Sequence, residues 1–236
     1  MGERMTVAAP PVHGTGGPPS LTITVEDAAV AEFAAVPTLR FRTRVDAGAA
    51  AVRSVTLTAQ IRIAADRRHY DEAAKERLVE LFGPPGGWGR TVRSLLWTHA
   101  TCQVPGFTGS TVVDVPVGCT YDFEVAVAKY FHALDDGDVP LEFLFSGTVF
   151  YADGGLLRAA HLSWETESAY RMPVRVWKDA MDHYFPGSAW LRLPRATFDR
   201  LYAFKARNTL ATWEDAVEAL LRAGVAGGDP DRGGRP

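Results

Sequence analysis

The chain has 236 residues, of which 47% are hydrophobic and 22% are charged, which is ordinary for a folded globular protein that buries a substantial core. Its net charge of −3 at pH 7 excludes a global positive field that would attract nucleic acid or an anionic membrane. No stretch approaches the roughly 18 consecutive apolar residues of a membrane span, and residues 1–20 lack the apolar run of a signal peptide. We therefore expect a cytoplasmic protein.

The residue types that hold metals and cofactors are scattered along the chain. The six histidines include no pair at the i, i+4 spacing that places two ligands on one helix face. The glycine-rich stretch 83–90 lacks the Lys-Ser/Thr of a phosphate-binding loop, and the acidic turn 135–138 lacks the spacing of a calcium loop. Cys102 and Cys119 form no CxxC pair, so we expect two reduced thiols. We expect no metal and no cofactor.

Pro, Gly and small residues without periodicity fill residues 1–20 and 224–236, which is typical of disordered tails. Between them we find neither a repeat nor a linker. The sequence therefore predicts a single α+β domain over residues 21–223. A strand-rich part, 21–170, precedes a helical part, 173–223.

Alternation of apolar and polar residues predicts an antiparallel sheet in the strand-rich part. Strands are predicted at 21–25, 38–45 and 55–63, with a connection around Gly48 between the last two. Further strands are expected at 95–97, 111–117 and 141–151, and the last of these forms a hairpin with 156–164 through an Asp-Gly turn. A short amphipathic helix is expected at 71–82. The apolar residues of 121–134 fit both the period of two of a strand and the period of 3.6 of a helix. We favour a strand that becomes a helix near Ala128.

From Pro173 the apolar period changes from two to 3.6. This predicts a helix that ends at Pro186-Gly187, an extended segment at 190–193 and a second helix that begins at Pro194. A third helix is expected from Thr212, where Asp215 completes a capping box. Its apolar stripe consists of Trp213, Val217, Leu220 and Leu221.

Three arginines, Arg40, Arg42 and Arg44, lie on one face of the strand predicted at 38–45. One interpretation is a solvated face of the sheet. The other is a docking surface for an acidic partner. A nucleic-acid surface is disfavoured because no aromatic platform accompanies these arginines and the chain is net acidic.

The aromatic residues that crowd into residues 177–213 include Trp177, Trp190, Phe198, Tyr202, Phe204 and Trp213. Most of these six fit the core faces of the predicted helices. Trp190 lies on the extended segment, and Phe204 lies off the stripe that contains Phe198 and Tyr202. We expect these two to be exposed, and exposed apolar residues often mark a binding surface. Together with Leu191 and Leu193, they form the predicted binding site.

The run PVRVWKDAMDHYFPGSAWLRLPRATFDRLYAFK, residues 173–205, resembles in layout the C-terminal part of the protein-export chaperone SecB family. In that family a sheet is followed by a helix, an extended Leu-x-Leu-Pro-like segment and a second helix. Leu191, Leu193 and Pro194 fit this pattern. The resemblance implies apolar grooves that hold extended client polypeptides, whereas residues 66–138 would be an insertion and the acidic tail of that family is absent.

The whole chain, notably TYDFEVAVAKYFHALDDGDVPLEFLFSGTVFY, is also similar to a bacterial family without an assigned function. Members of that family are encoded near nickel–iron hydrogenases, which implies an accessory or assembly role. The leading hypothesis is therefore a non-enzymatic, chaperone-like protein that binds a polypeptide or protein partner. The sequence leaves open whether this protein also forms a homo-oligomer. The alternatives are a small-molecule enzyme with a polar site around Tyr121–His132 and Glu165, and a structural subunit of a larger complex.

Overall fold

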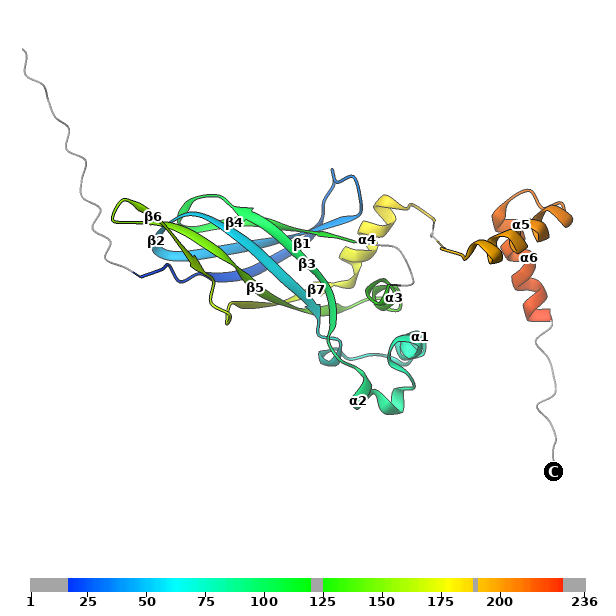
Figure 1. The fold of residues 1–236 in the computed structure, drawn as a ribbon. Helices are drawn as coiled ribbons and strands as arrows, with labels where there is room; N and C mark the ends of the chain where they lie inside the picture. Colours follow the sequence, from blue (N-terminus) through cyan, green and yellow to red (C-terminus); the bar gives the residue numbers. More distant parts are fainter. Residues whose placement is uncertain (1–16, 120–124, 189–190, 227–236) are drawn as a thin grey trace, which may run out of the picture. The chain divides into compact units, whose positions relative to one another are not determined.

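The computed structural model describes residues 17–119, 125–188 and 191–226 (Figure 1). The chain divides into two compact units, Met1–Trp190 and Leu191–Pro236, which we call the sheet unit and the hairpin unit. The sheet unit contains the strands and the hairpin unit contains two helices. The predicted α+β class is confirmed. That 21–223 folds as one domain stays a prediction.

The described residues of the sheet unit form one antiparallel sheet of seven strands. Its central strand, β2 (Thr38–Ile63), pairs with four others. The remaining strands are β1 (Thr22–Val30), β3 (Leu95–Val104), β4 (Phe107–Gly118), β5 (Asp138–Asp153), β6 (Leu156–His161) and β7 (Glu167–Pro173). The first half of β2 lies between β1 and β4, and its second half lies between β3 and β5.

The connection predicted around Gly48 is wrong. Residues 38–63 form one continuous strand, in which the ladder with β4 is interrupted between Asp46 and Ala51. Gly48 has φ 58°, and its backbone N–H donates to the Asp46 carboxylate at 2.7 Å. The chain bends here without reversing, because each half of β2 already has its own pair of neighbouring strands.

The core lies between the two halves of the bent sheet. Inward residues alternate along β2, as the sequence predicted, and include Phe41 in its first half and Ile61 in its second. Phe143, which pairs with Ile61 through β5, meets the ring of Phe41 at a centroid distance of 5.1 Å. Fully burying one such side chain stabilises the fold by about 1.5–3 kcal/mol. The edge-to-face contact of the two rings therefore fastens one half of the sheet to the other.

Helices gather at one end of the sheet unit (Figure 1). They are α1 (Glu72–Phe82), the short α2 (Trp88–Thr91), α3 (Ala126–His132) and α4 (Val174–Tyr184), with single 3₁₀ turns at Ala65–Arg67 and Pro85–Gly87. Asp71 caps α1 by accepting from the Ala74 N–H at 2.7 Å. Aspartate is a preferred N-cap residue, so the start of this helix is predictable from the sequence. α3 begins close to the predicted position, and the strand predicted before it falls mostly on residues 120–124, outside the described residues.

The hairpin unit consists of α5 (Arg195–Arg207) and α6 (Trp213–Ala226). The predicted capping box is confirmed, because the Thr212 hydroxyl accepts from the Asp215 N–H and the Asp215 carboxylate accepts from the Thr212 N–H, both at 3.0 Å. Residues 191–194 are neither helix nor strand. None of the described helices has the length and apolar character that a membrane crossing needs.

Candidate polypeptide-binding groove

The hairpin unit carries an apolar groove of about 690 Å³. Both helices and the segment before α5 contribute to it. Most of its lining is aliphatic or aromatic, and its polar members are two arginines and a threonine. The lining residues are Leu191, Leu193, Thr197, Arg200, Leu201, Ala203, Phe204, Arg207, Val217, Leu220 and Leu221.

Three of the predicted binding residues, Leu191, Leu193 and Phe204, line this one groove. Phe204 is half-buried there and not fully exposed as expected. Trp190 lies outside the described residues. The structure therefore brings together the part of the predicted apolar site that it describes.

The contribution of α6 to the groove was missed. The sequence identified the apolar stripe of Val217, Leu220 and Leu221 on the third predicted helix, but it did not assign this stripe to the binding site. In the structure these side chains are 43%, 43% and 58% exposed. A regular stripe predicts an amphipathic helix, and it does not reveal whether the same chain covers the apolar face.

An aromatic cluster connects the two helices. The ring of Trp213 lies 5.3 Å from that of Phe198 and 6.1 Å from that of Tyr202. Lys205 lies over Trp213 at 5.6 Å, and its ammonium donates to the carbonyls of Leu210 and Ala211, each at 2.9 Å. These contacts fix the turn between the helices. They do not bury the rings of Phe198, Tyr202 and Trp213, which are all exposed. The sequence-based prediction that these rings belong to the core is therefore wrong.

The arginines near the groove differ in whether they have an acidic partner. Arg200 and Arg207 line it, and neither forms a salt bridge within the described parts of the chain. By contrast, Arg195 pairs with Asp199 at 3.0 Å along the same helix. Two unpaired cations therefore border an apolar surface.

The predicted arginine row on β2 is paired with acidic residues of the neighbouring strands. Arg40 lies 3.3 Å from Asp114 of β4. Arg42 and Arg44 both approach Glu26 of β1, at 3.7 and 2.5 Å. The positive charge of this face is thus largely compensated within the sheet, an arrangement that favours the solvated-face interpretation.

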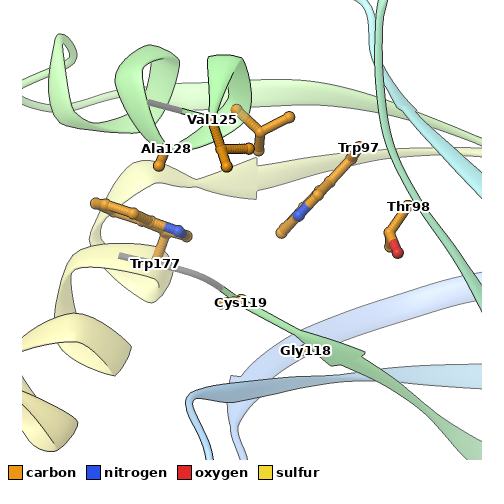
Figure 2. A pocket seen from close by; sticks show the side chains of 8 residues that line it. Trp97, Thr98, Gly118, Cys119, Val125, Ala128 and Trp177 are labelled. Atoms are coloured by element: carbon orange, nitrogen blue, oxygen red, sulfur yellow. The ribbon is translucent and has the colours of Figure 1, made fainter. Parts of the chain in front are cut away.

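A second cavity, of about 170 Å³, lies in the sheet unit between β3, the end of β4, α3 and α4. Figure 2 shows the rings of Trp97 and Trp177 on opposite sides of it. The ring of Phe131 contacts both, with its centroid 5.1 Å from that of Trp97 and stacked on Trp177 at 5.3 Å with 11° between the ring planes. The remaining lining residues are Thr98, Gly118, Cys119, Val125, Val127 and Ala128.

Cys119 is the titratable group of this second cavity. Burial raises the pKa of its thiol from the ordinary 9.0 to about 12, against a smaller opposing effect of a backbone hydrogen bond. The thiolate is the nucleophilic form of cysteine, so this thiol is poorly suited to nucleophilic catalysis near neutral pH.

The enzyme hypothesis required a polar pocket around residues 121–132 and Glu165. Tyr121 lies outside the described residues, and the cavity beside α3 has no carboxylate among its described lining residues. Glu165 is exposed and does not line it. The described geometry therefore gives this hypothesis no specific support.

A third cavity, of about 350 Å³, lies beside α2 and includes Arg68, Tyr70 and Trp88. The Tyr70 hydroxyl lies 2.8 Å from that of Tyr130 and 2.7 Å from the Ala65 carbonyl. The Arg68 guanidinium donates to the carbonyls of Asp136 and Asp138, both at 2.5 Å. Burial raises the pKa of both tyrosines, so they stay neutral. We regard this network as structural, since the two tyrosine hydroxyls and both terminal nitrogens of Arg68 are hydrogen-bonded within it, and Nε of Arg68 is buried without a partner in the described parts of the chain.

Comparison with known proteins identifies a family. The model of a family of unknown function, DUF6084, matches residues 18–227, and the chain belongs to this family. No curated protein matches it. The hydrogenase neighbourhood and the SecB resemblance stay predictions.

Two solved structures of the beta-glucosidase from Kluyveromyces marxianus are weakly similar to the chain. The complex with glucose has 12% identity and a TM-score of 0.23, and the selenomethionine-labelled form has 13% identity and a TM-score of 0.22. In both cases the match covers 65% of this chain and 15% of the enzyme. The chain thus spans about a seventh of the length of these proteins, and so low a similarity carries no functional argument.

Proposed function

We propose that this DUF6084 member is a non-enzymatic polypeptide-binding protein that holds a segment of a partner protein in the groove of its hairpin unit. The observation that carries the proposal is the poor burial of this unit. Among its described residues only Ala216 is buried, while Leu191 and Leu221 in the groove are 72% and 58% exposed.

The energetics of the hairpin support this proposal. α5 has 13 residues and α6 has 14, lengths at which isolated helices are marginal in water. A unit this small rarely stabilises itself by its own core. Each Å² of apolar surface that a partner covers contributes about 25 cal/mol. A partner segment in the groove would therefore stabilise the hairpin while being held by it.

The partner implied by the sequence resemblance is a subunit of a nickel–iron hydrogenase, and the role would be that of an assembly-accessory or chaperone-like protein. A permanent structural subunit would use the same groove but would not release its partner. The lifetime of the complex separates these roles, because assembly factors must dissociate.

The test uses two matched leucine substitutions in the full chain. Leu221→Ala removes an exposed groove side chain, and Leu157→Ala removes one from β6 that is 68% exposed and lies outside the groove. The probes are a reduced, alkylated unfolded protein and purified hydrogenase subunits, titrated by calorimetry. We expect Leu221→Ala alone to weaken binding. A wild-type chain that binds none of these probes contradicts the proposal.

A further inference from the structure

The arginines of the groove share one face of α5. Arg200 and Arg207 are seven residues apart and both line the groove, which places their α-carbons about 10.5 Å apart along the helix axis. Between them, Leu201 and Phe204 supply apolar lining. The surface offered to an occupant is therefore an apolar strip bordered by two cations at a two-turn spacing.

We infer that the occupant is an amphipathic α-helix of a partner protein that carries two acidic residues seven positions apart beside its apolar face. This inference rests on the proposed function and specifies the partner class. Carboxylates form charge-assisted, bidentate pairs with arginine. A helix of the partner repeats the spacing of α5, so residues at i and i+7 lie on one face and match both arginines at once.

An extended segment fits this surface less well. A strand advances about 3.3 Å per residue, so three residues cover nearly the distance between the arginines. Residues at i and i+3 of a strand point to opposite faces, however, whereas a residue at i+2 falls short by about 4 Å and one at i+4 overshoots by about 3 Å. Of the α-helix and the β-strand, only the α-helix satisfies both the distance and the direction.

Helix α6 of a second copy does not offer the required pattern. The exposed acidic residues of α6 that flank its apolar stripe are Glu214 and Glu218, which lie four residues and so about 6 Å apart. Asp215 is already engaged in the capping box. The α6 helix of a copy would therefore neutralise one arginine of the groove and not both.

The test measures binding of designed peptides to the full chain by fluorescence anisotropy at low ionic strength. Each peptide is a helix of about 18 residues, or five turns, with leucines on one face. The first carries Glu at two positions seven apart beside that face, the second carries Lys at the same two positions, and the third carries the Glu pair four apart. We expect the first to bind at least about tenfold more tightly than either of the others.

Charge reversal in the chain provides the second arm. The double variant Arg200→Glu/Arg207→Glu should prefer the Lys peptide over the Glu peptide. The control is Arg90→Glu/Arg175→Glu, which makes the same change in net charge at exposed arginines of the sheet unit and should leave the wild-type preference unchanged. Equal binding of all three peptides, no binding of the first, or an unchanged preference in the groove double variant overturns the inference.

The leucine variants distinguish failure of this inference from failure of the proposed function. If Leu221→Ala weakens binding of every peptide while the charge reversal has no effect, the groove binds polypeptides without the acidic specificity. If neither change matters, both proposals fail. Sedimentation velocity of the chain alone measures whether the chain self-associates. Self-association that Arg200→Glu/Arg207→Glu abolishes would identify a second copy as the occupant and overturn the inference.

Discussion

Phe204 of α5 and Leu220 of α6 line the same groove although 16 positions separate them in the sequence. The turn between the helices brings them together, and the contacts of Trp213 and Lys205 fix that turn. The groove is thus a property of the hairpin as a whole. Neither helix forms it alone, so loss of the turn should remove the site without any change in its lining residues.

Replacement of Phe204 by alanine should separate binding from stability. Phe204 is half-buried in the groove, so Phe204→Ala removes ring surface that a partner would cover, and we expect binding of the acidic helical peptide to weaken by about tenfold or more. Substitutions outside a packed core change stability by about 0.5 kcal/mol, and the melting temperature should shift by less than about 2 °C. Trp190→Ala should behave in the same way. Anisotropy titration and thermal unfolding by circular dichroism measure the two effects.

The matched control for that experiment is Phe143→Ala. Phe143 is fully buried and contacts Phe41, so its loss should cost about 3–5 kcal/mol and lower the melting temperature strongly. Peptide affinity should persist below that temperature. A Phe204→Ala chain that melts as early as the Phe143→Ala chain would assign Phe204 to the core instead of the binding surface.

Gly147 should tolerate no side chain. Its φ is 151°, and a β-carbon there would lie 2.0 Å from the carbonyl oxygen of Thr56 on the paired strand. Gly147→Ala must therefore separate β5 from β2, and we expect a loss of more than about 2 kcal/mol in the free energy of unfolding. Urea denaturation measures it. Gly86→Ala, where a β-carbon meets nothing within 4 Å, is the control, and equal stability of the two variants would show that the strands adjust.

The Cys119 thiol should stay protonated across the physiological range. Because burial raises its pKa to about 12, alkylation by iodoacetamide in a Cys102→Ser chain should be slow at pH 8 and accelerate only as the pH approaches 12. The folded state binds this proton more tightly than the unfolded chain, so its contribution to stability is complete below pH 9 and is lost between about pH 9 and 12. Alkylation at pH 8 as fast as that of a free cysteine peptide would contradict the burial of this thiol.

The arginine row on β2 should contribute little to peptide binding. Arg40, Arg42 and Arg44 are exposed and already paired across the sheet, and exposed pairs of this kind contribute about 0–1 kcal/mol to stability. The triple alanine variant should bind the acidic peptide with an affinity within about twofold of the wild type, since its charges lie outside the groove. A loss as large as that of Phe204→Ala would instead place the binding surface on the sheet.

The strands were largely predictable because one face of the sheet is buried. Alternation along 55–63 and 141–151 indicates which residues point inward, and the structure confirms this at Ile61 and Phe143. Gly48 could not be interpreted correctly from the sequence, because a glycine with positive φ serves equally at a reversal and at a bend. The choice between them depends on which strands pair with each half of β2, and that pairing is not local.

The site was predictable only on its apolar side. Leu191 and Leu193 were recognisable because they occupy a short extended segment between two helices. Arg200 and Arg207 gave no signal, since an arginine at helical spacing usually marks a solvated face. The role that we propose for these arginines depends on the lack of a salt bridge to either of them within the described parts of the chain and on the proximity of α6. Only the three-dimensional structure shows these two features.

Hydrogen exchange of the full chain, with and without the acidic helical peptide, shows whether the groove of the hairpin unit holds a helix. The described hairpin buries almost nothing, so the amides of α5 and α6 should exchange rapidly in the free chain. We expect the peptide to slow exchange in residues 195–226 and to leave exchange in the buried strands β2 and β5 unchanged. Protection confined to the sheet unit, with the hairpin unaffected, would contradict this expectation.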